Sequence, residues 1–276
     1  MRTSRTSPLA AVTARLAAAG CVSARAEARW LLEETGGEPE ALEAMVARRA
    51  AGEPLQYVIG WAPFGPLRIH VGPGVFVPRP ETEGLADRAA RHLRHAAPQE
   101  RLAVDLCTGS GAIACFLAAT VPGARVVATE LDPGALVWAH RNCAAHGVEL
   151  LAGDLDRPLP AALAERVRVL CANVPYVPSA AIATLPHDVQ EHEPRAALDG
   201  GPDGLDVLRR VAATAPRWLA PGGVLFCEIG EDQGAAATAL FQAAGLTEVA
   251  VRPDLVGRDR VIRGQRPADL SNDRQT

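Results

Sequence analysis

The chain has 276 residues, of which 48% are hydrophobic and 22% are charged. These fractions are close to ordinary globular usage and exclude an intrinsically disordered chain, and the length suggests a catalytic domain with a smaller companion. A formal charge of −4 and the absence of Lys/Arg blocks argue against stable nucleic-acid binding, which normally needs a basic surface.

The N-terminal region has the start and stop signals of helices. Capping residues predict three short helices, at about residues 8–19, from Ser23 to before Gly36, and from Pro39 to about Ala51. We expect residues 1–51 to form a small helical bundle. Such a bundle is either a packing appendage or a module that docks a partner, and the pattern alone favours packing.

From residue 52 to residue 80 proline and glycine punctuate short apolar runs. The runs that we expect to be extended are Tyr57–Ile59, Leu67–Val71 and Val75–Val77. This segment is therefore predicted to be a linker that contains a hairpin.

Strands and helices alternate in the remainder, residues 81–276. The predicted strands are Leu102–Leu106, Arg125–Thr129, Val148–Leu151, Val167–Ala172 and Val224–Glu228, with late extended runs near 247–252 and 260–263. The predicted helices lie at about 81–95, 111–120, 133–146, 205–219 and 232–244. This alternation predicts an α/β fold with a doubly wound, mostly parallel sheet, in which ligands bind at the carboxyl ends of the strands.

The first predicted strand runs into a glycine-rich turn. The turn residues that we expect at a nucleotide-like ligand are Asp105, Cys107, Thr108, Gly109, Ser110 and Gly111. Glycines let the backbone approach a ligand closely, and the start of the next helix offers unpaired N–H groups. Glu130 ends the second strand, where a carboxylate can accept both hydroxyl protons of a ribose. A dinucleotide-dependent dehydrogenase has nearly the same pattern, and a simple tight turn explains the glycines equally well.

The end of the fourth predicted strand separates these interpretations, because Asn173-Val174-Pro175-Tyr176 has no place in a dehydrogenase. The Asn173 oxygen and the carbonyl of residue 174 can accept the two N–H bonds of a primary amide, which orients its nitrogen for transfer of a methyl group. Tyr176 can stack on the flat amide, and Pro175 can hold the loop rigid. The four residues are also a common turn composition, so their place at a strand end carries the functional interpretation.

The cysteines and the apolar runs bear on the compartment. None of the six cysteines forms a C-x-x-C pair or has a histidine beside it at metal-ligand spacing, so neither a disulfide framework nor zinc is indicated. No apolar run reaches the about 18 residues typical of a membrane span. We expect a protein of the reducing cytoplasm, without a membrane partner or a bound metal.

A series of motifs extends through nearly the whole chain. In chain order they are Gly52–Gly60, Pro73–Glu83, the turn from Asp105, Asn173–Tyr176, Glu193–Arg195 with Asp203–Leu205, Glu228–Gly230 and Asp254–Arg260. In this order the motifs resemble those of the peptide-chain-release-factor N(5)-glutamine methyltransferases. The resemblance implies a class I S-adenosylmethionine methyltransferase domain behind a small N-terminal helical domain that helps to dock the release factor. It also implies transfer of a methyl group from S-adenosyl-L-methionine to the glutamine of that factor's Gly-Gly-Gln loop.

The resemblance also implies roles for single residues. Asp105 to Gly111 and Glu130 would hold the cofactor, and Asp154 or Leu155 would flank its adenine. Asn173 would touch both the cofactor and the substrate. Phe76 and Arg79 would line the mouth of the substrate pocket. Beside these, Arg195 can pair with Asp199 or Asp203 and order a loop over that pocket.

Two positions depart from the family's usual pattern. Residue 174 is Val where Pro is usual, which keeps the backbone carbonyl but not the stiffness of the proline ring, and Cys107 stands where Gly is common. The helical bundle is also short. These departures keep open a divergent paralogue that acts on another protein, and a cofactor-binding paralogue without turnover. Methylation of an exocyclic nucleobase amine is a further alternative, which the low positive charge disfavours.

Three other polar residues have weaker claims on function. His187 and His192 could be metal ligands, but no third ligand stands at suitable spacing, so we expect them to be polar loop residues. Glu228 ends a buried strand, where it is either a pocket acid or a terminus bonded to backbone, and we favour the structural role.

Overall fold

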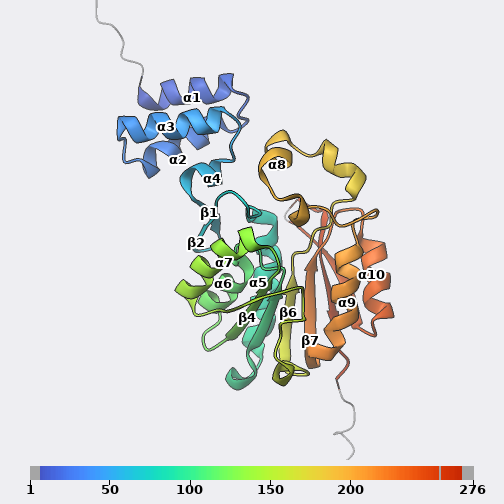
Figure 1. Ribbon diagram of the computed structural model, residues 1–276. Coiled ribbons are helices and arrows are strands. Elements are labelled where there is room, and N and C mark those ends of the chain that lie inside the picture. The colour runs from blue at the N-terminus through green and yellow to red at the C-terminus, as the bar shows by residue number, and fades with distance from the viewer. Residues whose placement is uncertain (1–6, 255, 269–276) are drawn as a thin grey trace, which may run out of the picture.

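The computed structural model describes residues 7–254 and 256–268 (Figure 1). Its centre is a seven-stranded sheet with the order β5-β4-β3-β6-β7-β9-β8. The strands are β3 (Leu102–Leu106), β4 (Arg125–Glu130), β5 (Glu149–Ala152), β6 (Val167–Ala172), β7 (Leu219–Glu228), β8 (Thr247–Pro253) and β9 (Asp259–Gln265). The pairs among β3 to β7 are parallel, whereas β9 runs antiparallel to β7 and β8. This sheet confirms the predicted doubly wound, mostly parallel fold.

Helices cover both faces of the sheet (Figure 1). They are α5 (Pro80–His95), α6 (Ala112–Thr120) and α7 (Pro133–His146) on one face, and α9 (Asp206–Trp218) and α10 (Gly234–Ala243) on the other. Along β3, Ala103 belongs to the first core and Val104 to the second, the alternation expected of a strand. All of β3 is buried, Asp105 included. Because both faces are covered, a ligand can reach the sheet only at the ends of its strands.

The N-terminal helices have a hydrophobic core of their own. They are α1 (Pro8–Ala18), α2 (Ala24–Glu34), α3 (Pro39–Ala50) and the short α4 (Leu55–Ile59). Leu16, Leu31 and Val46 meet in this core, and Val58 of α4 joins them. The three helices predicted before residue 52 are confirmed, while the outer domain limits, residues 1 and 276, lie outside the described residues. In Figure 1 this bundle lies toward the same end of the molecule as α8 (His187–His192).

The predicted linker contains the hairpin of β1 (Trp61–Phe64) and β2 (Leu67–His70). The extended conformation predicted for Tyr57–Ile59 was wrong, because these residues belong to α4. Gly60 ends this helix in the left-handed conformation, at φ 84°. A single helical turn carries Val58 into the core of the bundle, and an apolar run this short does not distinguish helix from strand.

The extended run predicted at Val75–Val77 does not form a strand, because this segment is a bend followed by irregular backbone. Pro73 and Pro78 flank it and have no N–H for a strand ladder. The Val75 carbonyl instead accepts a hydrogen bond from the hydroxyl of Tyr57.

Several short helices had no prediction. They are η1 (Pro98–Glu100), η2 (Ala161–Leu163), η3 (Ser179–Thr184), α8 and η4 (Arg195–Ala197). Each begins at or directly after a proline and is too short to show a helical period. Strand β7 begins earlier than predicted, because Leu219 pairs with Val167 ahead of an irregularity in the ladder. None of the described helices is long and apolar enough to cross a membrane.

Replacing Phe64 with alanine should lower the free energy of unfolding by about 3–5 kcal/mol, because a buried aromatic ring is lost. Phe64 is fully buried, and its ring meets that of Phe116 edge-on with the centroids 5.9 Å apart. Urea unfolding followed by circular dichroism measures the change. Val137→Ala, at a position 66% exposed, is the control, with an expected change below about 0.5 kcal/mol. Equal losses in the two variants would contradict this account of the core.

Candidate active site

A cavity of about 500 Å³ opens at the carboxyl ends of β3, β4 and β6. The predicted site residues that line it are Phe76, Cys107, Thr108, Gly109, Ser110, Glu130, Asp154, Leu155 and Asn173 to Tyr176. Asp105, Gly111, Arg79 and Arg195 are not part of this lining. Strand β3 pairs with β4 on one side and with β6 on the other, so the strand order reverses direction at β3. The cavity lies at this point, which is the usual ligand position in doubly wound sheets.

The glycine turn depends on left-handed backbone at alternate positions. Cys107, Gly109 and Gly111 have φ angles of 55°, 59° and 88°. A Cβ atom at Gly111 would lie 3.0 Å from the Cys143 sulfur, so a side chain at this position would be crowded as well as strained. Cys107 adopts the same left-handed conformation with a side chain, which is unfavourable for any residue other than glycine.

Asp105 is fully buried at the end of β3. Its Oδ2 accepts a hydrogen bond from the Thr108 hydroxyl at 2.6 Å, whereas its Oδ1 has no partner among the described residues. Burial raises the pKa of Asp105 to about 7. A buried carboxylate oxygen without a partner is costly, and a cationic or N–H-bearing ligand would remove that cost.

Glu130 ends β4 with its carboxylate directed at backbone amides. Oε2 accepts the N–H of Gly109 at 2.8 Å, and Oε1 accepts those of Leu131 and Asp132, each at 2.8 Å. Burial raises the pKa of Glu130, while these three hydrogen bonds favour its charged form. A carboxylate offers about four lone-pair sites, so one remains for a ligand hydroxyl.

Asp154 and Leu155 form another part of the lining, beyond β5. Both oxygens of Asp154 accept from the Arg210 guanidinium, at 2.7 and 2.8 Å. Leu155 is buried and in the left-handed conformation, with φ 50°. This pairing leaves Asp154 with less capacity for a ligand and gives Leu155 the character of an apolar wall.

The loop after β6 holds the groups expected to meet a planar amide. Asn173 donates from Nδ2 to the Thr82 hydroxyl at 3.2 Å, and the Tyr176 hydroxyl donates to Glu228 Oε1 at 3.1 Å. Burial raises the pKa of Tyr176, so its phenol stays protonated. No backbone N–H among the described residues donates to the Val174 carbonyl. Asn173 Oδ1 and this carbonyl therefore remain available as acceptors.

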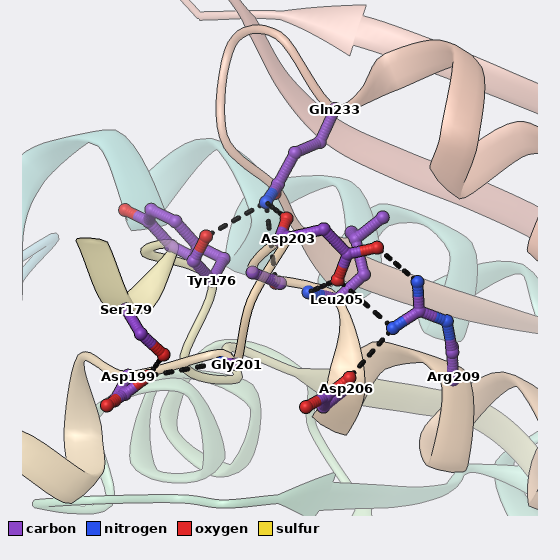
Figure 2. A network of polar contacts seen from close by, with 10 residues as sticks. Tyr176, Ser179, Asp199, Gly201, Asp203, Leu205, Asp206, Arg209 and Gln233 are labelled. Atoms are coloured by element: carbon purple, nitrogen blue, oxygen red, sulfur yellow. Dashed lines mark hydrogen bonds and ion pairs between the residues drawn. The ribbon is translucent and has the colours of Figure 1, made fainter. Parts of the chain in front are cut away.

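The side chain of Gln233 holds this loop by its backbone, as Figure 2 shows. Gln233 Nε2 donates to the Tyr176 carbonyl at 2.9 Å, and Gln233 Oε1 accepts the N–H of Gly230 at 2.8 Å. A Cβ atom at Gly204 would lie 2.2 Å from the Tyr176 carbonyl oxygen, so only glycine permits this close approach. The loop is thus clamped against the segment before α9.

Of the three residues predicted for the substrate pocket, Phe76, Arg79 and Arg195, the structure places one in the cavity lining and two outside it. Phe76 lines the cavity, and the Arg79 guanidinium lies 4.8 Å from its ring centroid. Arg79 also pairs with Glu193 at 2.5 Å, and that buried carboxyl has a pKa raised to about 7 by burial, which the Arg79 charge opposes. Arg195 pairs with Asp199 at 3.0 Å, whereas Asp203 pairs with Arg209 (Figure 2).

Four polar residues of the site were not predicted to act in it: Thr82, Glu193, Glu228 and Gln233. Thr82 and Glu193 lie within the motifs Pro73–Glu83 and Glu193–Arg195. Their place in these motifs was the sequence signal that could have identified them as site residues. Glu228 was assigned a structural role, and Gln233 carried no signal because its partners come from distant segments. No cluster of three or more metal-ligating side chains occurs among the residues described, and His187 lies 3.1 Å from Glu191.

Comparisons with known proteins agree with this geometry. Residues 35–60, which include α3 and α4, match the model described as the PrmC N-terminal domain. The release factor glutamine methyltransferase of Mycolicibacterium smegmatis is 43% identical, over 94% of this chain and 96% of the relative. That of Geobacter sulfurreducens is 40% identical, over 91% and 92%. The chain belongs to the release factor glutamine methyltransferase family. Among solved structures, a methyltransferase from Pyrococcus furiosus shares the fold of this chain with a TM-score of 0.53 and 19% identity. The match covers 74% of this chain and 90% of that structure.

Replacing Gln233 with leucine should lower the free energy of unfolding by about 1–3 kcal/mol, because buried backbone groups lose their partner. Urea unfolding measures this loss, and a raised KM for the methyl acceptor would report loosening of the loop. Gln242→Leu is the matched control, since Gln242 is exposed on α10. A Gln233→Leu protein as stable as the control would contradict the role assigned to this clamp.

Proposed function

We propose that this chain transfers the methyl group of S-adenosyl-L-methionine to the side-chain amide nitrogen of a glutamine, in the Gly-Gly-Gln loop of a peptide chain release factor. Family membership supports the reaction class and a protein substrate. The observation that carries the proposal is the pair of free acceptors, Asn173 Oδ1 and the Val174 carbonyl, on a clamped loop at the cavity. A primary amide has two N–H bonds to satisfy with such a pair.

The residues present fit the cofactor. Asp105 Oδ1 is a buried acceptor with no hydrogen-bond partner in the described part of the chain, and it would accept from the ammonium group of the methionine portion. Glu130 would accept a hydrogen bond from one ribose hydroxyl, and Leu155 would pack on the adenine. When bound, the cofactor supplies an electrophilic methyl group on a sulfonium.

The residues of the chain would then act by orientation and electrostatics. Two acceptors facing the amide N–H bonds favour positive charge on nitrogen as the methyl group transfers, which opposes delocalisation of the lone pair into the carbonyl. Tyr176 would present its ring to the flat amide, and its bond to Glu228 fixes the direction of that ring. No strong base is needed, because the methylated amide can release its proton after transfer.

The pocket mouth and the helical bundle would select the protein partner. Phe76 lines the cavity, and Glu193 holds the Arg79 guanidinium against the Phe76 ring, so that Arg79 would meet the substrate outside the lining. Residues 35–60 match a domain model of this family, and the bundle lies toward the α8 end of the molecule (Figure 1). We propose that this bundle docks the release factor and that residues 1–51, 52–80 and 81–276 act as docking, linker and catalytic segments. The six free cysteines are consistent with a reducing cytoplasm.

Labelled methyl transfer tests the reaction and the target together. Recombinant bacterial release factor should accept label from S-adenosyl-L-methionine, whereas a release factor with the Gly-Gly-Gln glutamine changed to alanine should not. Asn173→Ala should lower kcat by about a hundredfold, the effect of removing one preorganised electrostatic group. An oligonucleotide acceptor serves as the control. Label on the oligonucleotide, or on neither protein while the cofactor still binds, would contradict the proposal.

Cofactor affinity should rise by about tenfold between about pH 6 and about pH 8. Burial places the pKa of Asp105 at about 7, and only the ionised carboxylate can pair with an ammonium group. Binding therefore favours the charged form, lowers this pKa and releases a proton near neutrality. Isothermal titration calorimetry in two buffers measures both effects. Asp105→Asn is the matched control, because the cofactor's own titration is common to both proteins, and equal pH profiles would refute the role of Asp105.

A further inference from the structure

A line of hydrogen bonds leads from the end of β7 to the amide of Asn173. The Thr82 hydroxyl donates to Glu228 Oε2 at 2.6 Å, and Asn173 Nδ2 lies 3.2 Å from the same hydroxyl oxygen. Thr82 and Glu228 are buried, with 3% and 1% of their surfaces exposed. Thr82 lies in α5, Glu228 ends β7, and Asn173 directly follows β6, which places the line across the carboxyl end of the sheet.

Proton accounting gives this line a direction. A hydroxyl has a single proton, and an ionised carboxylate can only accept. Thr82 therefore donates to Glu228, and its oxygen can take only a donor from Asn173. The NH2 group of Asn173 must face Thr82, so its Oδ1 must face the other way. Without Thr82, rotation of the amide by 180° would present NH2 to the N–H bonds of a substrate, which is repulsive.

Glu228 also fixes the aromatic side chain of the loop, that of Tyr176. Its Oε1 accepts from Tyr176 at 3.1 Å, so one carboxylate orients both ends of Asn173–Tyr176. Burial raises the pKa of Glu228, whereas the two hydroxyls and the charge of Arg260 lower it and favour the ionised form. A carboxylate as buried as that of Glu228 is costly if it serves packing alone.

We propose that Thr82 and Glu228 are positioning residues that set the direction of the Asn173 side-chain amide and thereby present its oxygen to the substrate. The catalytic part of this inference rests on the proposed function. The amide orientation itself does not, because it follows from the hydrogen bonds of the chain alone.

The test compares Thr82→Val, which removes the hydroxyl at equal size, with Thr82→Ser, which keeps it. Thr82→Val should lower kcat for methylation of release factor by about 10- to 100-fold, while the cofactor Kd changes by less than about threefold. Thr82→Ser should restore kcat to within about threefold of the unaltered chain. Thr120→Val is the control, since that hydroxyl bonds only to the Phe116 carbonyl, at 2.7 Å, outside the site.

A second readout needs no activity. The asparagines of the chain are Asn142, Asn173 and Asn272, so selective nitrogen-15 labelling of asparagine gives three side-chain NH2 signals. Asn173→Ala assigns its own signal, and Asn142, held by His70 and Ser110, is an internal reference for an anchored amide. Hydrogen exchange of the Asn173 NH2 should be slow in the unaltered chain and in Thr82→Ser, and fast in Thr82→Val.

The outcomes separate the two proposals. Three results would overturn the positioning role. They are an unchanged kcat in Thr82→Val, an unchanged exchange of the Asn173 NH2 in that variant, and a loss of cofactor affinity as large as the loss of kcat. Absence of methyl transfer by the unaltered chain would overturn the proposed function instead, and the exchange measurement would still decide the orientation of Asn173.

Discussion

The carboxylates of Asp105, Glu130 and Glu228 are buried at the ends of β3, β4 and β7. The contacts that stabilise these buried acids determine how the rest of the site is arranged. Removing a charge from water is expensive, so each of these acids needs partners. Glu130 finds three backbone amides, and Glu228 finds two hydroxyls. Asp105 accepts from the Thr108 hydroxyl, and its Oδ1 has no hydrogen-bond partner among the described residues. The satisfied acids hold loops in place, whereas the unsatisfied one is the natural position for a cationic ligand.

The same constraint explains how elements far apart in the chain become one site. Glu228 joins the start of α5 to the loop after β6, and Glu193 joins the segment after α8 to Arg79 before α5. Each joint combines a buried acid with a donor from another segment. Such joints restrict side-chain rotation before any ligand arrives, and preorganised acceptors stabilise charge at little reorganisation cost. The cavity is therefore a rigid frame with free acceptors, which suits a reaction that depends on orientation.

The sequence predicted the sheet well, because buried parallel strands and their helices carry strong periodic signals. It predicted the cavity lining through the glycine turn and Asn173–Tyr176, since strand order brings carboxyl ends together. It did not predict that Asp154 is bound by Arg210, or that Gln233 clamps the Tyr176 carbonyl. Those contacts join segments separated by dozens of positions, and no local pattern encodes them. The short helix α4 was missed for the same reason, because the core of the bundle, not local propensity, decides its conformation.

Val174 shows how such contacts can replace local stiffness. Proline would restrict the backbone through its ring, a purely local device. In this chain Val174 is 2% exposed and packs in the same core as Leu205. Its neighbours are fixed on both sides, Asn173 through Thr82 and Tyr176 through Gln233 and Glu228. A residue held between two anchored neighbours has little freedom left to lose, so the loop keeps its shape and residue 174 contributes its carbonyl whether or not it is proline.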